Sequence, residues 1–285
     1  MGVDTGVARR PLIFRKEAYL ADLVRHPTVV RLLDAYLVES RVHLVYELAQ
    51  QDLCSFIVAS AGHLGSDAIR STTFQVLTAL RHIHQCGLIH TDVKPTNIFI
   101  RTTSPWVCIL GDVGCAVEVE GLSVARGFAV TYVRAYVRAS PNVRMHVRTY
   151  AGVCWHFLPQ ISPPEAGAAN RFGDDVVTTL WYRAPEVLYN YQAWGPTIDT
   201  WSMGMVLAEL TGMAWHKVGG KDAMMAALPK HLGTPTPDVT SKWLDWRDWG
   251  FHARVPWPRA VRTFLGAAGE DLLDKLLAWD PAARV

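Results

Sequence analysis

The sequence lacks the features that would send the chain out of the cell or into a membrane. Its first residues, MGVDTGVARR, contain no apolar run of the kind found in signal peptides, and Gly6 stands where N-myristoylation requires Ser or Thr. No stretch has the length and apolarity of a membrane span, because Asp112 and Glu118 interrupt the apolar run from Trp106 to Val119. We therefore expect a soluble protein with no membrane partner.

Cysteine is scarce, and no pair of cysteines forms a C-x-x-C motif. The five cysteines are scattered along the chain: Cys54, Cys86, Cys108, Cys115 and Cys154. An odd number of scattered thiols favours reduced cysteines, and hence a cytoplasmic or nuclear protein, over a disulfide framework.

Charge of one sign is not in excess either, since 28 basic residues face 26 acidic ones. This balance neither favours nor excludes a nucleic-acid or membrane surface. A chain of 285 residues suits one large domain or two lobes.

The most informative stretch is LIHTDVKPTNIFI, residues 88–100. Apolar pairs at both ends predict an anchored loop, and Pro95 prevents helical continuation. The loop presents one carboxylate (Asp92), one ammonium (Lys94) and one carboxamide (Asn97). These are the groups that phosphoryl transfer to a hydroxyl requires: a proton acceptor, a positive charge for the moving phosphoryl group and a metal ligand.

The loop resembles the catalytic loop of protein kinases, H-R-D-x-K-x-x-N, with Thr91 in place of the usual arginine. Four further matches follow in the order the kinase family has them. They are Gly111-Asp112-Val113-Gly114 for the metal-binding D-F-G element, Ala184-Pro185-Glu186 inside TLWYRAPEVL, Asp199 inside IDTWSMG, and Asp280-Pro281 with Arg284, the late arginine that pairs with Glu186. Five ordered matches are far more specific than any single motif.

The resemblance implies an α+β, two-lobe protein kinase fold, with an incomplete small β-lobe and a mainly helical large lobe. Residues 1–49 would form part of the small lobe and the hinge, and residues 50–285 the large lobe. HLGTPTPDVTSKW, LWYRAPEVL and the hinge resemble the group that contains cyclin-dependent and mitogen-activated kinases. The implied activity is transfer of the γ-phosphate of ATP to Ser or Thr hydroxyls of protein substrates, with Mg²⁺ as metal.

The same resemblance assigns the catalytic and metal-binding residues. Asp92 would orient and deprotonate the hydroxyl, Lys94 would steady the phosphate, and Thr179 would bridge these two side chains. Asn97 and Asp112 would hold Mg²⁺. A lysine that follows the aspartate by two residues also favours Ser and Thr over Tyr as acceptor.

The nucleotide-binding residues are likewise implied by alignment to the family. Glu17 would pair with an ATP-binding lysine, and Tyr46 would be the gatekeeper. The hinge would run from Glu47 to Ala49, with Asp52 on the ribose side. Phe99, after the catalytic loop, is also assigned to the nucleotide site.

Local patterns predict the supporting elements. Residues 11–24 read as a short helix, and residues 29–36 and 42–47 as two strands. Residues 66–87 read as a helix with Ser66 as N-cap, Gly87 as terminator and apolar side chains at Ile69, Phe74, Leu77, Leu80 and Ile83. Residues 198–212 are apolar nearly all round, which predicts a buried helix. His82, His84, Cys86 and His90 resemble metal ligands, but 82 and 84 point to different helix faces, so we expect no zinc site.

Three departures from the family pattern leave the function open between two classes. No glycine-rich loop and no V-A-I-K lysine precede Glu17, so we expect an N-terminally truncated chain, and Lys16 is the neighbour of Glu17. Thr91 replaces the arginine that docks a phosphorylated activation segment, although Asp174 and Asp175 offer negative charge nearby. The chain also stops at Val285, before the lobe would finish. The alternative to an enzyme is a catalytically inactive kinase that serves as a binding module.

The segment between Asp112 and Glu186 is much longer than ordinary loops, and we assign the surplus to an insertion at residues 126–172. The insertion interleaves arginines with aromatic residues, a pattern that suits nucleic acid or an acidic partner. A loop excursion without a ligand is the interpretation we favour.

The kinase resemblance implies protein substrates as the expected partners. A cyclin-like regulatory subunit is a guess from the resemblance, because PLIFRKE lacks the cyclin-recognition sequence of related kinases.

Overall fold

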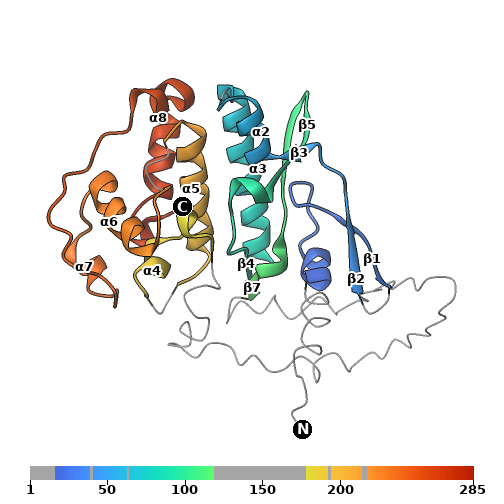
Figure 1. The fold of residues 1–285 in the computed structure, drawn as a ribbon, viewed down its shortest axis with the longest axis horizontal. Helices are drawn as coiled ribbons and strands as arrows, with labels where there is room; N and C mark the ends of the chain where they lie inside the picture. The colour runs from blue at the N-terminus through green and yellow to red at the C-terminus, as the bar shows by residue number, and fades with distance from the viewer. Residues whose placement is uncertain (1–16, 39–40, 63, 119–177, 192–193, 214–216) are drawn as a thin grey trace, which may run out of the picture.

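The computed structural model describes residues 17–38, 41–62, 64–118, 178–191, 194–213 and 217–285 (Figure 1). The predicted insertion at 126–172 and the pair Asp174 and Asp175 lie outside the described residues. The described part mixes helix and sheet, as predicted. The smaller part, with the hairpin β1–β2, lies at one edge (Figure 1). The larger part is mainly helical: helices α5 to α8 lie at the other edge, and α3 lies between them and the hairpin.

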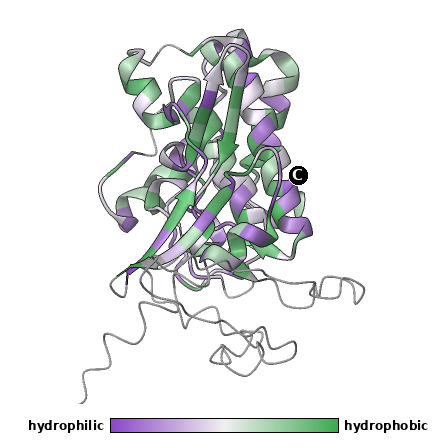
Figure 2. Ribbon diagram, turned by 90° about the vertical axis from the view of Figure 1, so that its right-hand side faces the viewer, coloured by the Kyte–Doolittle hydropathy of each residue, from purple (hydrophilic) through white to green (hydrophobic). Residues whose placement is uncertain are grey.

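The strands are short and pair antiparallel. The strands are β1 (Leu32–Val38), β2 (Arg41–Tyr46), β3 (Gln51–Asp52), β4 (Leu88–Ile89), β5 (Ile98–Thr103), β6 (Trp106–Leu110) and β7 (Val117–Glu118). They form three sheets, β1–β2, β3–β5–β6 and β4–β7. Residues of β2 alternate between exposed and half-buried, the pattern of a strand with one covered face. Figure 2 shows polar and apolar stretches interleaved along the strands that face the viewer.

The helices make up most of the larger part. The α-helices are residues 17–23, α2 (Leu53–Ala59), α3 (Ser66–Gln85), α4 (Pro185–Leu188), α5 (Thr197–Leu210), α6 (Lys221–Leu232), α7 (Pro237–Thr240) and α8 (Arg259–Leu276). The 3₁₀ turns are η1 (Pro95–Asn97), η2 (Val113–Cys115), η4 (Leu180–Tyr182) and η5 (Pro281–Ala283). None of the helices in the described ranges has both the length and the apolarity of a membrane span.

Helix α5 is the centre of the larger part. Ile198, Trp201, Met203 and Leu207 are buried although they point in different directions from the helix axis, as expected for a helix that is apolar all round. It packs between α3 and α8. Because α5 is enclosed, a charged side chain on it is costly to bury unless it has partners inside the protein.

Helix α3 supports the loop that follows it. Ile69, Leu80 and Ile83 face the core as predicted, and Gly87, with φ of 75°, ends the helix in the left-handed conformation that glycine adopts easily. Two predictions for this helix are wrong. The N-cap is Gly65, because its backbone is extended and Ser66 is already helical. Phe74 is 73% exposed, since it lies on the solvent side of the helix.

The first predicted strand begins later than expected. Val29 lies outside β1 and instead forms an isolated parallel bridge with Leu110 at the end of β6. The backbone N–H of Leu110 donates to the carbonyl of Thr28, and the N–H of Val30 donates to the carbonyl of Leu110, both at 2.8 Å. The segment after helix 17–23 is therefore tied directly to the strand that leads to Asp112.

Candidate active site

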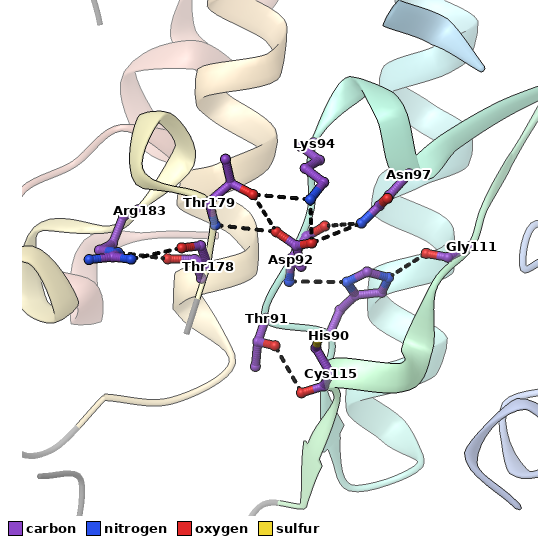
Figure 3. A network of polar contacts seen from close by, with 10 residues as sticks. All are labelled: His90, Thr91, Asp92, Lys94, Asn97, Gly111, Cys115, Thr178, Thr179 and Arg183. Atoms are coloured by element: carbon purple, nitrogen blue, oxygen red, sulfur yellow. Dashed lines mark hydrogen bonds and ion pairs between the residues drawn. The ribbon is translucent and has the colours of Figure 1, made fainter. Parts of the chain in front are cut away.

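The loop between β4 and β5 brings three predicted side chains together (Figure 3). Lys94 Nζ lies 2.6 Å from Asp92 Oδ2 and donates to Thr179 Oγ1 at 3.1 Å. The hydroxyl of Thr179 donates to Asp92 Oδ1 at 2.8 Å. Thr179 comes from a segment far along the chain, so the contact joins the loop to the region before α4. The carboxylate, ammonium and hydroxyl form a closed triangle of hydrogen bonds.

Asp199 on α5 holds the backbone of this loop. Its two carboxylate oxygens accept the N–H groups of His90 and Thr91, both at 2.8 Å, and its side chain is fully buried. His84 Nε2 lies 2.8 Å from the same carboxylate. Three partners therefore compensate the burial of this charge, which would otherwise be costly. They also fix the residues that immediately precede Asp92.

Thr91 differs in role from the arginine that the family pattern has at this position. It is buried, its φ is 68°, and its hydroxyl donates to the carbonyl of Cys115 at 3.0 Å. A β-branched residue rarely adopts a positive φ, so the bonds from Asp199 and to Cys115 must hold it there. Thr91 thus joins the loop to the segment after Asp112 by a neutral hydrogen bond.

Asn97 and Asp112, the predicted magnesium ligands, lie on turns that a backbone hydrogen bond joins. The amide nitrogen of Asn97 donates to the backbone carbonyl and to Oδ2 of Asp92, at 2.8 and 3.1 Å, and its amide oxygen accepts no hydrogen bond from the described residues. The N–H of Gly111 donates to the carbonyl of Asn97 at 2.9 Å, which brings the start of the Asp112 turn next to Asn97. Asp112 is exposed, with φ of 61°. One carboxylate and one amide oxygen are ligands that Mg²⁺ accepts when phosphates and water complete the octahedron.

Asp92 is held in its ionised form. Burial alone raises the pKa of this carboxyl, but the hydrogen bonds from Lys94 and Thr179 and the charge of Lys94 outweigh burial, so its pKa lies below the ordinary value of 3.8. At neutral pH the carboxylate is therefore available as a proton acceptor.

This shift predicts a pH dependence of stability. A carboxyl with a lowered folded-state pKa stabilises the fold above its unfolded pKa, and this contribution disappears as the pH falls through the folded pKa. We expect Asp92→Asn to lower the melting temperature at neutral pH. The difference from the wild type should shrink as the pH falls below about 4. Melting curves of both proteins between about pH 3 and pH 7 test this, and a difference that stays constant would contradict it.

Glu17 is placed near Asp112 but has an unexpected partner. The Tyr46 hydroxyl donates to Glu17 Oε1 at 2.8 Å, and no lysine contacts Glu17 among the described residues. A methyl group at Gly114, two residues after Asp112, would lie 3.4 Å from Cγ and Cδ of Glu17 and 3.5 Å from Asp112 Oδ1. Among the described residues, the hydrogen-bond partner of Glu17 is thus a tyrosine, and its pairing with an ATP-binding lysine stays a prediction.

The residues assigned to the hinge lie where β2 leaves the hairpin. Glu47 is not free, because its two carboxylate oxygens accept from Arg101 Nη2 at 2.9 and 2.7 Å, and Oε1 also accepts the N–H of Arg31. The backbone carbonyl of Glu47 and the N–H of Ala49 take part in no hydrogen bond among the described residues. These backbone groups are therefore available to an adenine edge, whereas the Glu47 side chain ties the hinge to β5.

Asp52 and Phe99 flank the hinge. Asp52 caps α2, since its carboxylate accepts from the N–H and the hydroxyl of Ser55 at 2.9 and 2.6 Å. Burial tends to raise the pKa of Asp52, but the bonds from Ser55 lower it below its usual value. Phe99 lies against Gly111, where a methyl group would approach the ring to 2.6 Å, so the glycine makes room for the ring beside the Asp112 turn.

The predicted contact between Glu186 and Arg284 is present. Arg284 donates from both Nη atoms to the two carboxylate oxygens, at 2.5 and 2.7 Å, and both side chains are fully buried. Arg284 also lies over the ring of Trp201, with Cζ 4.9 Å from the ring centroid. The ion pair fixes the end of the segment that delivers Thr179. Arg183, in the same segment, donates to the backbone carbonyl of Thr178, the residue before Thr179, at 2.9 Å.

Two residues that support the site were missed or misread in the sequence. His84 drew attention only as a metal ligand, and the structure gives it Asp199 as partner instead. Arg101 follows Phe99 by two positions in β5, so the two side chains lie on the same face of the strand. This spacing is the one feature of the sequence that could have indicated that Arg101 lies near the site. Within the described ranges, no group of three or more His, Cys, Asp or Glu side chains is arranged to hold a metal.

The comparison with protein families identifies the class that this geometry defines. The protein kinase domain model matches residues 8–138 and 165–285, which is most of the chain. The chain therefore belongs to the protein kinase family, and the resemblance predicted from its motifs is confirmed.

Among curated proteins, the chain is similar to cell division control protein 2 homolog 3 of Trypanosoma brucei brucei. The two are 25% identical over 293 residues, which cover 99% of this chain and 76% of the trypanosome protein. Residues 139–164, which the family model leaves unmatched, fall within the insertion predicted at 126–172.

Proposed function

We propose that this protein kinase transfers the γ-phosphate of ATP to serine and threonine hydroxyls of proteins and requires Mg²⁺ to do so. The observation that carries the proposal is the triangle formed by Asp92, Lys94 and Thr179. It places a proton acceptor, Asp92, beside a positive charge, Lys94, and the hydroxyl of Thr179 is hydrogen-bonded to both. The family match and the similarity to a cell division control protein support the same activity.

Each side chain of the triangle has a separate task. Asp92, which is ionised at neutral pH, accepts the proton of the attacking hydroxyl. Lys94, held by Asp92 and Thr179, balances the negative charge of the phosphoryl group as it moves. Thr179 keeps the other two aligned, so little reorganisation is needed during transfer.

Asn97 and Asp112 would hold the metal, and the hinge would hold the base. When bound, Mg²⁺ neutralises the charge of the ATP phosphates and orients them. The protein contributes the amide oxygen of Asn97 and the exposed carboxylate of Asp112, which lie on adjacent turns joined by the Gly111–Asn97 bond. The unpaired backbone groups of Glu47 and Ala49 suit the hydrogen-bonding edge of adenine.

A transfer assay tests the proposal. The full chain, with labelled ATP and a mixture of peptides that contain Ser, Thr or Tyr, should label Ser and Thr peptides in the presence of Mg²⁺. Chelation of the metal should abolish labelling. Labelling of tyrosine alone, or labelling that survives chelation, would contradict the proposal.

The alternative function, a binding module without transfer, has one observation in its favour. Glu17 is bound by a neutral hydroxyl where the family pattern has an ammonium group. This alternative predicts that the chain binds partners or nucleotide while no peptide becomes labelled. The transfer assay therefore separates the two functions.

Partners and location complete the proposal. Protein substrates follow from the kinase family, while a cyclin-like subunit stays a prediction that co-purification can test. A cytoplasmic or nuclear location stays a prediction from the scattered, odd-numbered cysteines of the sequence, which imaging of the tagged protein in cells can test.

A further inference from the structure

The contact between Tyr46 and Glu17 connects two elements that backbone hydrogen bonds do not join. Tyr46 ends β2, opposite Leu32 in the hairpin, and Glu17 lies at the start of the described helix 17–23. The hydroxyl of Tyr46 donates to Glu17 Oε1 at 2.8 Å. Both side chains are partly buried, so water competes only weakly for this bond.

The charges around the hydroxyl keep its proton in place. Burial, the hydrogen bond to Glu17 and the negative charges of Glu17 and Asp112 all raise the pKa of Tyr46 well above its ordinary value. Tyr46 is therefore a permanent donor at neutral pH. Among the described residues, this hydroxyl is the hydrogen-bond donor to the Glu17 carboxylate.

Helix 17–23 has a second attachment at its other end. The segment that follows it is tied by backbone hydrogen bonds between Thr28, Val30 and Leu110, at the end of β6. That attachment fixes the end of the helix farther from Glu17. The Tyr46 hydrogen bond fixes the end that contains Glu17, and Glu17 in turn packs on Gly114 in the turn that presents Asp112.

We propose that Tyr46 is a positioning residue, whose hydroxyl holds Glu17 and helix 17–23 against the Asp112 turn by a neutral hydrogen bond. The helix is thereby kept beside Asp112, the predicted metal ligand. The catalytic consequence of this contact rests on the proposed kinase function. The contact and its effect on the helix are independent of that function.

Hydrogen exchange of the backbone amides in residues 17–23 tests the proposal without relying on activity. Tyr46→Phe keeps the ring and removes the donor, and we expect exchange in this helix to become about tenfold faster, as for loss of a hydrogen bond to a charged group. Tyr36→Phe is the matched control, because Tyr36 is a half-buried tyrosine of the same hairpin that stacks on His43. It should leave exchange in residues 17–23 unchanged.

A double variant shows whether Tyr46 acts through Glu17. If it does, Tyr46→Phe combined with Glu17→Ala should exchange no faster than Glu17→Ala alone. Additive effects, or unchanged exchange in Tyr46→Phe, would overturn the proposal.

Activity provides a second readout that a merely structural tyrosine would not move. In the transfer assay, Tyr46→Phe should lower kcat and raise the Mg²⁺ concentration needed for half-maximal rate, while KM for the peptide stays the same. A change confined to the peptide KM would also overturn the positioning role. If the wild type transfers no phosphate, the proposed function fails, and the exchange result still decides the role of Tyr46.

Discussion

Asp92→Asn is expected to lower the rate of phosphoryl transfer to a Ser or Thr peptide by about 10²–10⁴-fold. The variant keeps the shape of the side chain and loses the charge that accepts the hydroxyl proton. It also weakens the hold on Lys94, whose Nζ lies 2.6 Å from the carboxylate. Initial rates at saturating ATP and Mg²⁺ measure the effect.

The matched control for this variant is Asp271→Asn. Asp271 lies on α8 and forms an exposed ion pair with Lys275, at 2.7 Å and within one helical turn. The same chemical change at this position should leave the transfer rate within about twofold, since exposed ion pairs contribute little. Equal turnover by Asp92→Asn and the wild type would remove Asp92 from the mechanism.

Glu186→Gln is expected to lower the free energy of unfolding by about 3–5 kcal/mol. The substitution leaves the guanidinium of Arg284 buried without a counter-charge, although its bonds to the carbonyls of Ala278 and Trp279 remain. Arg284→Met should cost a similar amount, because it leaves Glu186 as the uncompensated charge. Urea unfolding followed by tryptophan fluorescence measures both.

Two comparisons make this prediction specific to a buried pair. Asp271→Asn, which breaks an exposed pair, should cost less than about 1 kcal/mol. The double variant Glu186→Leu with Arg284→Met should recover part of the loss, because it removes both charges together. A loss below about 1 kcal/mol for Glu186→Gln would show that the pair does not hold the chain segment before α4.

The sequence predicted those parts of the structure that local pattern determines. The loop at 88–100 is anchored by β4 and β5 because apolar pairs flank it, and Pro95 is the first residue of the short 3₁₀ turn η1. Helix α5 is buried all round because its apolar residues leave no polar face. The pair of Glu186 and Arg284 followed from the family resemblance, which supplied a contact between residues that are distant in the sequence.

The sequence did not predict contacts that depend on how separate elements pack. Val29 reads as a strand residue, but its partner is Leu110, so the hairpin begins three residues later at Leu32. Phe74 matches the helical apolar spacing, yet it is exposed because the stripe that faces α5 and β6 is offset from it. Tyr46 carries no sign in the sequence that it would meet Glu17, since the two are brought together only by the packing of β2 beside helix 17–23.

Nucleotide binding with and without Mg²⁺, measured by titration calorimetry, tests the central claim most directly: that Asp92, Lys94, Asn97 and Asp112 form one site for ATP and its metal. We expect the full chain to bind ATP in the presence of Mg²⁺. Chelation of the metal or Asp112→Asn should weaken binding by more than about tenfold, while Asp271→Asn should not change it. Absence of binding, or equal binding with and without Mg²⁺ in the wild type and Asp112→Asn, would contradict the claim.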